Sequence, residues 1–453
     1  MSTQAHEQTI WGHPKGLYIL FFTELWERFS YYGMRAILIL YLTAKTTDRN
    51  GGLGWDDVSA LELYGWYTMF VYVMSVPGGL LADRLIGQKK AVMLGGFLLV
   101  IGHIILAFDA LWAFYSGLVF IVMGVGALKP NISTMVGGLY NTGDAKRDTG
   151  FIIFYIGINI GAFSAPLIVG YIGEVINWHY GFGLAGIGMI LGQIVYIWGQ
   201  KYLKNVGNFV PIVRDKNSNK EVPLTAIEKD RMIVLILSFI IIMVFWAAYE
   251  QGGGLLNLFA KDKIDREVFG FTVPTTFLQA LKAFFVVLLG VPIAWLWTQW
   301  RKKGKQSSSL FKMGIGTIII GFGFLLLAKA ALETSTTIDG KASLIWMVGA
   351  YLLFVIGELS ISPVALSFIT KLAPIKYASL MMGTYFLVSG LGNKLAGLVG
   401  EVAKNAGELN VFIGVLIFCV SFGLLLIVFV KRLNKLTHGA ENVDKNNTVI
   451  EAE

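Results

Sequence analysis

The sequence predicts an all-α membrane protein with twelve transmembrane helices. Of its 453 residues, 55% are hydrophobic and 15% are charged, whereas soluble domains contain about 45–50% apolar and about 25% charged residues. The apolar residues are gathered in long runs, and about 20 such residues suffice to cross the hydrocarbon core of a bilayer. The predicted spans are residues 17–43, 60–82, 91–108, 111–138, 149–173, 179–200, 231–259, 273–299, 311–331, 343–370, 376–400 and 408–431.

One long polar break divides the chain into two halves. Residues 201–230 are rich in lysine and arginine and contain Pro211 and Pro223, which disfavour a continuous helix. Two sets of six spans favour a binding site between the two bundles at mid-membrane. We expect an N-terminal six-helix bundle in residues 1–200, a cytoplasmic linker in 201–230, a C-terminal six-helix bundle in 231–433 and a polar tail in 434–453.

The positive charges indicate the orientation in the membrane. Lysine and arginine follow the even-numbered spans, as at Arg84, Lys89 and Lys90 after the second span, and the other connections are poorer in cations. The positive-inside rule then places both termini in the cytoplasm, as an even number of spans also requires. Because the basic residues lie in short loops between spans, the net charge of +8 indicates orientation and not nucleic-acid binding.

The first span carries ionisable side chains along one helix face. Glu24, Glu27, Arg28, Tyr31 and Arg35 fall within an arc of roughly 100°. Each charge costs about 2.5–3.5 kcal/mol at the bilayer centre. We therefore predict that this face lines a hydrated pathway inside the protein. Two other interpretations remain: static ion pairs that hold helices together, and snorkelling of the glutamate nearest the membrane surface.

Four later spans also contain polar side chains at membrane depth. In the fifth and tenth spans the two polar residues are four apart and therefore share one helix face. Glycine and proline near several of these residues permit bends and close helix approach. The side chains are Lys129 in the fourth span, Tyr155 and Asn159 in the fifth, Trp246 and Glu250 in the seventh, and Glu358 and Ser362 in the tenth.

This set of charges favours a coupled carrier. A buried carboxylate that exchanges a cationic partner for solvent changes its affinity for protons, and therefore acts as a proton switch. Glu24 or Glu27 with Arg28 or Lys129 would form such pairs in the first half, and Glu358 would serve in the second. The opposed charges also suit a zwitterionic solute, whose body aromatic side chains would accommodate. A sodium site would instead need oxygen ligands without fixed cations beside them.

The loop after the second span contains a glycine-rich, charged motif. Residues 79–90 include Gly79, Asp83, Arg84 and Gly87. The glycines allow a tight turn between helices, and the carboxylate and cations would latch the cytoplasmic helix ends as a gate. The motif resembles the cytoplasmic signature of the major facilitator superfamily, which implies the major facilitator fold with its two six-helix bundles. The equivalent loop after the eighth span lacks the acid.

Several segments together resemble the proton-dependent oligopeptide transporter family. The run from Glu24 to Gly33 resembles the family's first-span signature, and residues 154–161 resemble its motif in the fifth span. The other matching segments are residues 129–131, 245–251 and 357–363. The resemblance implies a proton-coupled symporter that imports di- and tripeptides by alternating access across a bacterial inner membrane. Its expected partners are protons, a small peptide and the lipid bilayer, and we expect a monomer.

The resemblance also implies roles by position. Arg35 and Lys129 would face the peptide carboxylate, and Glu358 would face the peptide amine. The residues implied in proton coupling are Glu24, Glu27, Arg28, Lys129 and Glu358. The residues expected to bind substrate are Tyr31, Tyr32, Arg35, Tyr72, Lys129, Tyr155, Asn159, Trp246, Glu250, Lys282, Glu358 and Ser362.

The chain departs from the family pattern in three places. Bacterial members typically carry two additional helices between the sixth and seventh core spans, and residues 201–230 are too short and polar to form them. Span eight has Lys282 where the family tends to have asparagine. In span eleven, Lys394 follows Asn393 where an aromatic residue is common. Lys282 would either pair with Glu250 or favour peptides with an acidic side chain.

Two other functions stay open at this point. The same fold would carry nitrate, another small anion or a drug-like solute, and the added cations Lys282 and Lys394 support that alternative. A membrane receptor or enzyme is the other. The sequence contains no HExxH, CxxC or GxxxxGKS/T motif, so we expect no enzyme activity, cofactor or metal. His103 is either a proton relay or a histidine bonded to backbone.

Overall fold

The computed structural model describes residues 9–141, 144, 146–204, 206–209, 224–305, 307–374 and 378–440. The first half of the chain forms α1 (Lys15–Thr43), α2 (Asp57–Val73), α3 (Ser75–Leu81), α4 (Gln88–Leu106), α5 (Leu111–Gly138), α6 (Lys146–Tyr171) and α7 (Trp178–Gly199). The second half forms α8 (Ala226–Tyr249), α9 (Leu255–Lys263), α10 (Phe277–Lys302), α11 (Ser309–Thr334), α12 (Leu344–Leu372), α13 (Ala378–Ala406) and α14 (Glu408–Leu436).

Short helices and strands complete the chain. Two π-helical turns, η1 (Ala82–Ile86) and η2 (Ile172–Ile176), extend α3 and α6, and two 3-10 turns, η3 (Gln200–Tyr202) and η4 (Glu250–Gly253), extend α7 and α8. The strands are β1 (Thr9–Ile10), β2 (His13–Pro14), β3 (Ile264–Asp265), β4 (Glu267–Val268), β5 (Phe271–Thr272) and β6 (Ala342–Ser343). They pair as β1 with β2 and β4 with β5, both antiparallel, and β3 with β6, parallel.

The described residues contain twelve helical segments of a length that can span a membrane, which is the number predicted. Ten helical segments are long and apolar enough to cross a membrane, with α2, α3 and η1 acting as one and α8, η4 and α9 as another. The other two are α1 and α13, each 29 residues long. Both have the length to span but carry several ionic side chains, which must therefore face protein.

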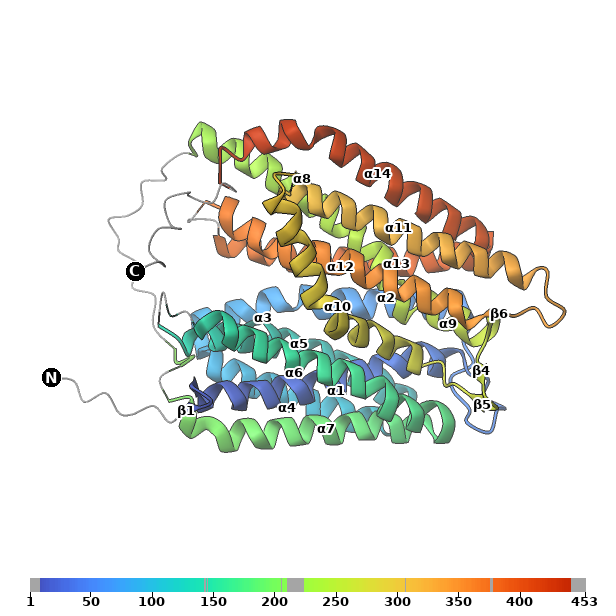
Figure 1. The fold of residues 1–453 in the computed structure, drawn as a ribbon. Helices are drawn as coiled ribbons and strands as arrows, with labels where there is room; N and C mark the ends of the chain where they lie inside the picture. Colours follow the sequence, from blue (N-terminus) through green and yellow to red (C-terminus); the bar gives the residue numbers. More distant parts are fainter. Residues whose placement is uncertain are drawn as a thin grey trace.

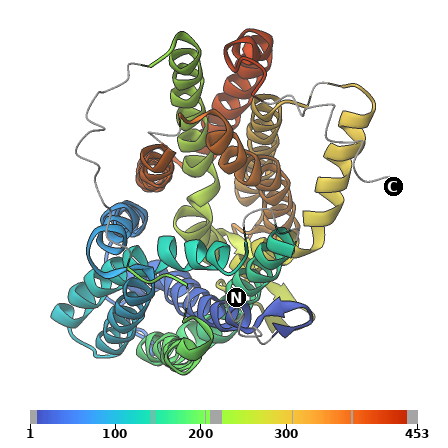
Figure 2. The same ribbon diagram turned by 90° about the vertical axis from the view of Figure 1, so that its left-hand side faces the viewer.

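The twelve spans form two bundles (Figure 1). In the first, α1 packs on α6 and α7, and α4 packs on α5. In the second, α11 packs on α12 and α14, and α8 packs on α13. We call the side where α1 begins and α14 ends the terminal face, and the opposite side, which carries β4, β5 and β6, the distal face. Viewed from the terminal face, the bundles lie on two sides of a central axis (Figure 2).

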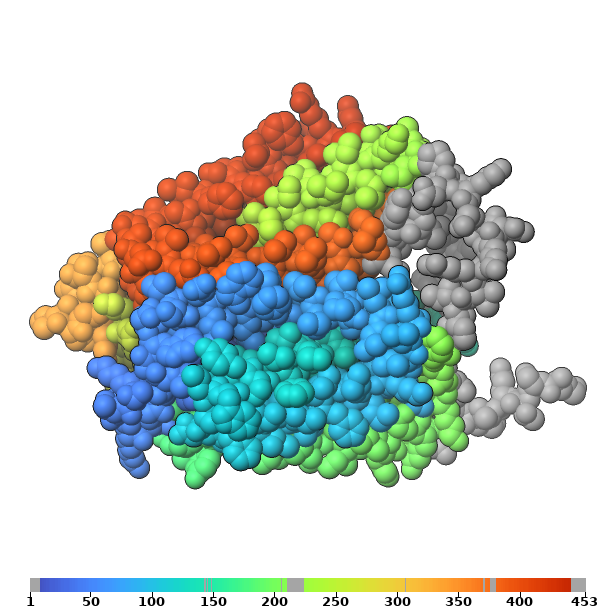
Figure 3. All heavy atoms as spheres, turned by 180° about the vertical axis from the view of Figure 1, so that it is seen from behind, coloured from blue at the N-terminus to red at the C-terminus, as the bar shows by residue number. Residues whose placement is uncertain are grey.

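The most extensive contacts between the bundles are those of α2 with α13 and of α6 with α10, and smaller ones join α3 to α13 and α1 to α9. From behind, the side chains of α2 and α13 meet along the boundary between the halves (Figure 3). Their backbones approach so closely that a side-chain carbon at Gly65 would lie 3.1 Å from the Gly397 Cα. Small residues at helix contacts permit this approach in membranes.

Polar contacts hold the bundles together at the distal face. The Glu174 carboxylate at the end of α6 accepts hydrogen bonds from the backbone N–H groups of Thr275 and Thr276, at 2.8 and 3.0 Å. These two residues immediately precede α10. Across the α2–α13 contact, Lys404 Nζ lies 3.0 Å from Asp57 Oδ2. These links join the two bundles at the distal face.

The ends of the predicted spans shift by a few residues. α8 begins before the predicted residue 231 because Thr225 and Glu228 form a capping box, in which each side chain accepts a hydrogen bond from the other residue's backbone N–H. α14 continues past the start of the predicted polar tail at residue 434. Half of the predicted linker (residues 205 and 210–223), the tail beyond residue 440 and the predicted start of span eleven at 376–377 lie outside the described residues.

Candidate functional site

An ionic cluster lies on the buried face of α1. The Arg28 guanidinium donates a hydrogen bond to Glu27 and lies 3.2 Å from Glu24 Oε1. None of these three residues is more than 3% exposed, so Glu24 does not snorkel to the membrane surface. The Arg28 guanidinium also faces the rings of Tyr31 and Tyr32, at 5.4 and 5.8 Å from their centroids. The charged face of α1 therefore points into the protein.

Four polar atoms of this cluster have no hydrogen-bond partner within the described part of the chain. They are Oε2 of Glu24, Oε1 of Glu27, Nη2 of Arg28 and the hydroxyl of Tyr31. Buried polar groups normally bond to protein or to ordered water. The cluster therefore has free capacity for protons or water.

Lys129 lies on α5 close to the cavity. Its ammonium sits 3.9 Å from the centroid of the Tyr72 ring, a cation–π contact. No carboxylate among the described residues lies within 4 Å of this ammonium. In this conformation Lys129 is therefore a cation whose direct partner is an aromatic ring.

A second ion pair joins the two bundles. Arg35 on α1 pairs with the carboxylate of Glu250, where α8 ends in η4. The Arg35 Nε also donates to the hydroxyl of Tyr64 on α2, at 2.6 Å. Both ionic side chains are less than 10% exposed. The two residues expected to bind substrate separately are thus each other's partner in this structure.

A third cluster lies on the second bundle. The Tyr249 hydroxyl donates to the Glu358 carboxylate. The Lys282 ammonium donates to the Tyr249 backbone carbonyl at 3.2 Å and lies 4.2 Å from the centroid of its ring. Among the described residues, neither Lys282 nor Glu358 has an oppositely charged group within 4 Å. Lys282 is therefore near Glu250 without pairing with it.

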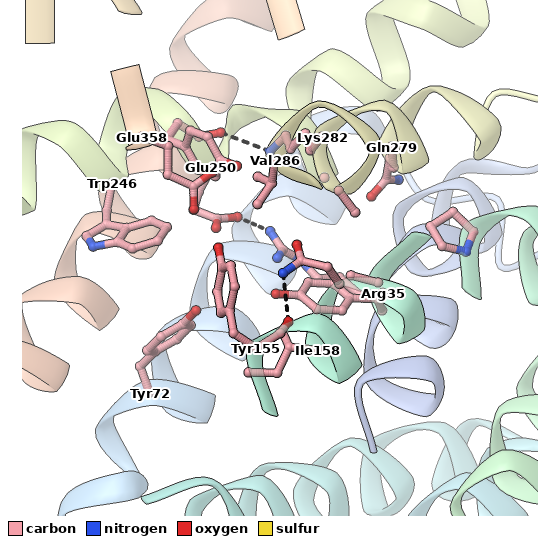
Figure 4. A pocket seen from close by; sticks show the side chains of 17 residues that line it. Arg35, Tyr72, Tyr155, Ile158, Trp246, Glu250, Gln279, Lys282, Val286 and Glu358 are labelled. Carbon is pink, nitrogen blue, oxygen red and sulfur yellow. Dashed lines mark hydrogen bonds and ion pairs between the residues drawn. The ribbon is translucent and has the colours of Figure 1, made fainter. Parts of the chain in front are cut away.

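The Arg35–Glu250 pair and the cluster of Tyr249, Lys282 and Glu358 border one cavity between the bundles, of about 170 Å³, which is room for several water molecules. Figure 4 shows Lys282, Glu250 and Glu358 on one side and Tyr155 on the other. Predicted site residues that line the cavity are Tyr32, Arg35, Tyr72, Tyr155, Asn159, Trp246, Glu250, Lys282 and Glu358. Tyr31, Lys129 and Ser362 do not line it. Glu24, Glu27 and Arg28 lie deeper in the first bundle.

Three residues of the site escaped sequence reasoning. Tyr64 and Tyr249 stand in aromatic, apolar runs, where nothing separates them from packing residues. Gln279 lines the cavity and donates to the Ala36 carbonyl at 3.3 Å. The one available signal was spacing, because Gln279 precedes Lys282 by one helical turn.

The predicted cytoplasmic gate motif forms the bend between α3 and α4. Gly87 adopts φ +80°, a conformation that favours glycine, and α4 starts directly after it. Asp83 and Arg84 lie in η1, are exposed, and make no ion pair within the described ranges. Gly79 faces open space. The motif is therefore unlatched in this structure.

Two residues singled out in the sequence lie away from the cavity. Lys394 pairs with Glu401 at 3.4 Å and lies 4.8 Å from the Trp66 ring centroid, at the α2–α13 contact. His103 is fully buried between α4 and α7, and neither ring nitrogen has a hydrogen-bond partner among the described residues. Neither residue touches the site.

Two helical bundles that enclose a charged cavity in the membrane define a carrier. The model of the POT family matches residues 89–229 and 217–416. The chain belongs to this family. It is therefore a multi-pass membrane transporter with a major facilitator-like fold, and not an enzyme.

Curated relatives match along nearly the whole chain. The uncharacterized transporter YclF of Bacillus subtilis (strain 168) is 37% identical, over 95% of this chain and 96% of its own. Peptide transporter YePEPT of Yersinia enterocolitica subsp. palearctica serotype O:3 (strain YE-P4) is 34% identical, over 96% and 98%. A di-/tripeptide transporter of Lactococcus lactis subsp. cremoris is 34% identical, over 95% and 98%.

Solved structures match the fold closely. A point mutant of a peptide transporter POT in complex with alafosfalin superposes with a TM-score of 0.88, at 34% identity, over 95% of this chain and 97% of that chain. A POT family transporter in complex with 5-aminolevulinic acid gives a TM-score of 0.87, at 31% identity, over 94% and 98%.

Proposed function

We propose that the protein is a proton-coupled symporter that imports di- and tripeptides across a bacterial inner membrane by alternating access. The observation that carries this proposal is a pair of unmatched charges in the cavity region. Lys129 on the first bundle has no carboxylate within 4 Å, and Glu358 on the second has no cation within 4 Å, among the described residues. A peptide with free ends supplies both missing counter-ions.

The two ends of the peptide would be bound by opposite bundles. Its carboxylate would bind Arg35 in the cavity lining and reach Lys129, which lies outside the lining against the Tyr72 ring, and its ammonium would bind Glu358. Arg35 is already held by Glu250, so the peptide carboxylate competes with Glu250 for the guanidinium. Breaking a buried ion pair without a substitute is costly, about 3–5 kcal/mol. Substrate binding therefore loosens a link between the bundles at little net cost.

Side chains of the peptide would lie among the aromatic and amide groups of the cavity. Tyr32, Tyr72, Tyr155 and Trp246 present ring surfaces that accept many shapes. Lys282 adds a cation that has no carboxylate partner among the described residues. It favours peptides that carry an acidic side chain, so peptides with and without such a side chain should differ measurably in their binding.

Protons would be carried on the α1 cluster. Arg28 is shared between Glu24 and Glu27, so protonation of one glutamate leaves the arginine on the other. The glutamate that loses the arginine can then contact Lys129 or the Tyr31 hydroxyl. The free oxygen atoms of both glutamates are where the proton would bind.

Alternating access would exchange the distal links for contacts at the terminal face. The described links at the ends of the bundles lie at the distal face, and we infer from them a state that opens toward the terminal side. By the positive-inside rule that side is the cytoplasm. In the opposite state Asp83 and Arg84 would latch the helix ends, and we propose that one chain suffices as the transporting unit.

Uptake of labelled dialanine into proteoliposomes tests the proposal. An inward proton gradient should drive accumulation above the external concentration, and a protonophore should abolish it. Unlabelled di- and tripeptides should compete, whereas nitrate and single amino acids should not. Absence of gradient-driven dialanine uptake by a correctly inserted protein, or competition by nitrate instead, would refute peptide symport.

A further inference from the structure

Tyr249 lies between the two opposite charges of the second bundle. Its hydroxyl donates to the Glu358 carboxylate, and its ring faces the Lys282 ammonium, 4.2 Å from the centroid. Its backbone carbonyl accepts a further bond from that ammonium at 3.2 Å. The side chain lines the cavity, although the residue as a whole is only 6% exposed. One residue thus contacts both an acid and a base of the site.

The ring of Tyr249 is fixed by its neighbours on α8. It stacks on Phe245, with centroids 5.5 Å apart and an interplanar angle of 21°. It meets Trp246 edge to face, at 5.6 Å and 86°. Aromatic contacts of this kind favour one ring orientation. The hydroxyl therefore reaches Glu358 from a preset direction.

The surroundings of Glu358 offer no other hydrogen bond in the described part of the chain. A lysine and a carboxylate in one low-dielectric cavity attract each other strongly, yet Lys282 and Glu358 stay more than 4 Å apart. The charged and titratable groups around Glu358 are Lys282 on α10, Glu250 in η4, Tyr249 on α8, Tyr32 on α1, Tyr155 on α6 and Tyr385 on α13.

We propose that Tyr249 is a positioning residue for recognition of the peptide amine. Its hydroxyl stabilises the ionised form of Glu358 and orients the carboxylate so that one oxygen stays open to an ammonium. Its ring and carbonyl hold Lys282 away from Glu358, which keeps both charges available to substrate. This inference rests on the proposed peptide transport, and it assigns separate tasks to the hydroxyl and to the ring.

The Tyr249→Phe substitution removes only the hydroxyl. Without that donor, Glu358 binds a proton more tightly, and a protonated Glu358 cannot hold an ammonium. In exchange assays at equal pH on both sides, the KM of dialanine falls as rising pH ionises Glu358. In Tyr249→Phe the midpoint of this fall should move upward by about one pH unit. N-acetylated dialanine, which lacks the amine, should show no such shift.

The Tyr249→Leu substitution removes the aromatic ring as well as the hydroxyl. Lys282 then relaxes toward Glu358 and neutralises it, so the KM of dialanine should rise by about a further tenfold above that of Tyr249→Phe. Lys282→Gln should reverse this additional rise in the Tyr249→Leu background and give no such gain in the wild type. That coupling in the double-mutant cycle separates the positioning role from a loss of packing.

Tyr41→Phe is the matched control, because Tyr41 is 3% exposed, packs against Phe114 and Phe182, and lies outside the cavity. An unshifted pH midpoint in Tyr249→Phe, an equal shift in Tyr41→Phe, or no rescue by Lys282→Gln would overturn the inference. Failure of the wild type to exchange dialanine would instead refute the proposed function.

Discussion

The distal link through Glu174 predicts a measurable change in the balance between conformations. Its carboxylate caps the start of α10 from the other bundle, with one oxygen on the N–H of Thr275 and the other on that of Thr276. Arg266 adds a cation 3.7 Å away. Glutamine keeps one acceptor and replaces the second with an NH₂ group, which faces an N–H donor and cannot accept its bond.

The magnitude follows from the groups lost. A hydrogen bond to a charged group contributes about 1.5–3 kcal/mol, and a charge at a helix N-terminus about 0.3–1 kcal/mol. Because the Glu174 side chain is 17% exposed, water compensates in part, and we take the lower end of the range. A loss of about 1.5 kcal/mol in the distal-closed state shifts the equilibrium about tenfold toward the distal-open state.

Spin labels across the distal face measure this shift. Asp48 and Ile338 are exposed in distal loops of the two bundles, and the single cysteine, Cys419, is buried and can be replaced by serine. Distance distributions in nanodiscs should show the long-distance population enlarged in Glu174→Gln. Glu267→Gln is the control, since Glu267 accepts from Thr272 within its own hairpin. Identical populations in Glu174→Gln and the wild type would refute the reasoning.

Two further predictions concern the charged clusters. Glu24→Gln and Glu27→Gln should each abolish proton-driven accumulation of dialanine while sparing peptide counterflow. The reason is that each substitution removes a binding site of the coupling proton and leaves the peptide site intact. Normal uphill uptake by both variants would contradict this prediction. Glu358→Ala should raise the KM of peptides with a free amine by about tenfold or more and change the KM of N-blocked peptides little. Only the peptides with a free amine lose a charged hydrogen bond. An equal rise in KM for both kinds of peptide would exclude Glu358 as the amine partner.

The features that sequence could predict are those set by local geometry. Helical periodicity alone placed Glu24, Glu27 and Arg28 on one face, and the cost of charge in lipid required that face to be buried. The structure confirms both. Hydropathy predicts ten of the spans equally directly, whereas α1 and α13 carry several ionic side chains in their apolar runs.

Contacts between the bundles could not be predicted in this way. The pairing of Arg35 with Glu250 depends on how two bundles are placed in one conformational state, and residues far apart in the chain carry no periodicity that relates them. Tyr249 was not predicted as a site residue because its hydroxyl bonds to a residue of another helix, Glu358. Lys394 looked like a pocket cation from its place beside Asn393, yet its helix turns it toward Glu401 and the α2–α13 contact.

The arrangement of charges also decides where a co-transported proton can reside. In the proposed mechanism a proton and a peptide ammonium would both neutralise the Glu358 carboxylate, so at that residue they would compete. Competition at one site produces exchange of peptide for proton, whereas symport requires both to be bound at once. A proton that travels with the peptide must therefore occupy a carboxylate that the peptide does not use. We propose Glu24 and Glu27 for this role, because they lie outside the cavity lining and each keeps one oxygen without a hydrogen-bond partner among the described residues.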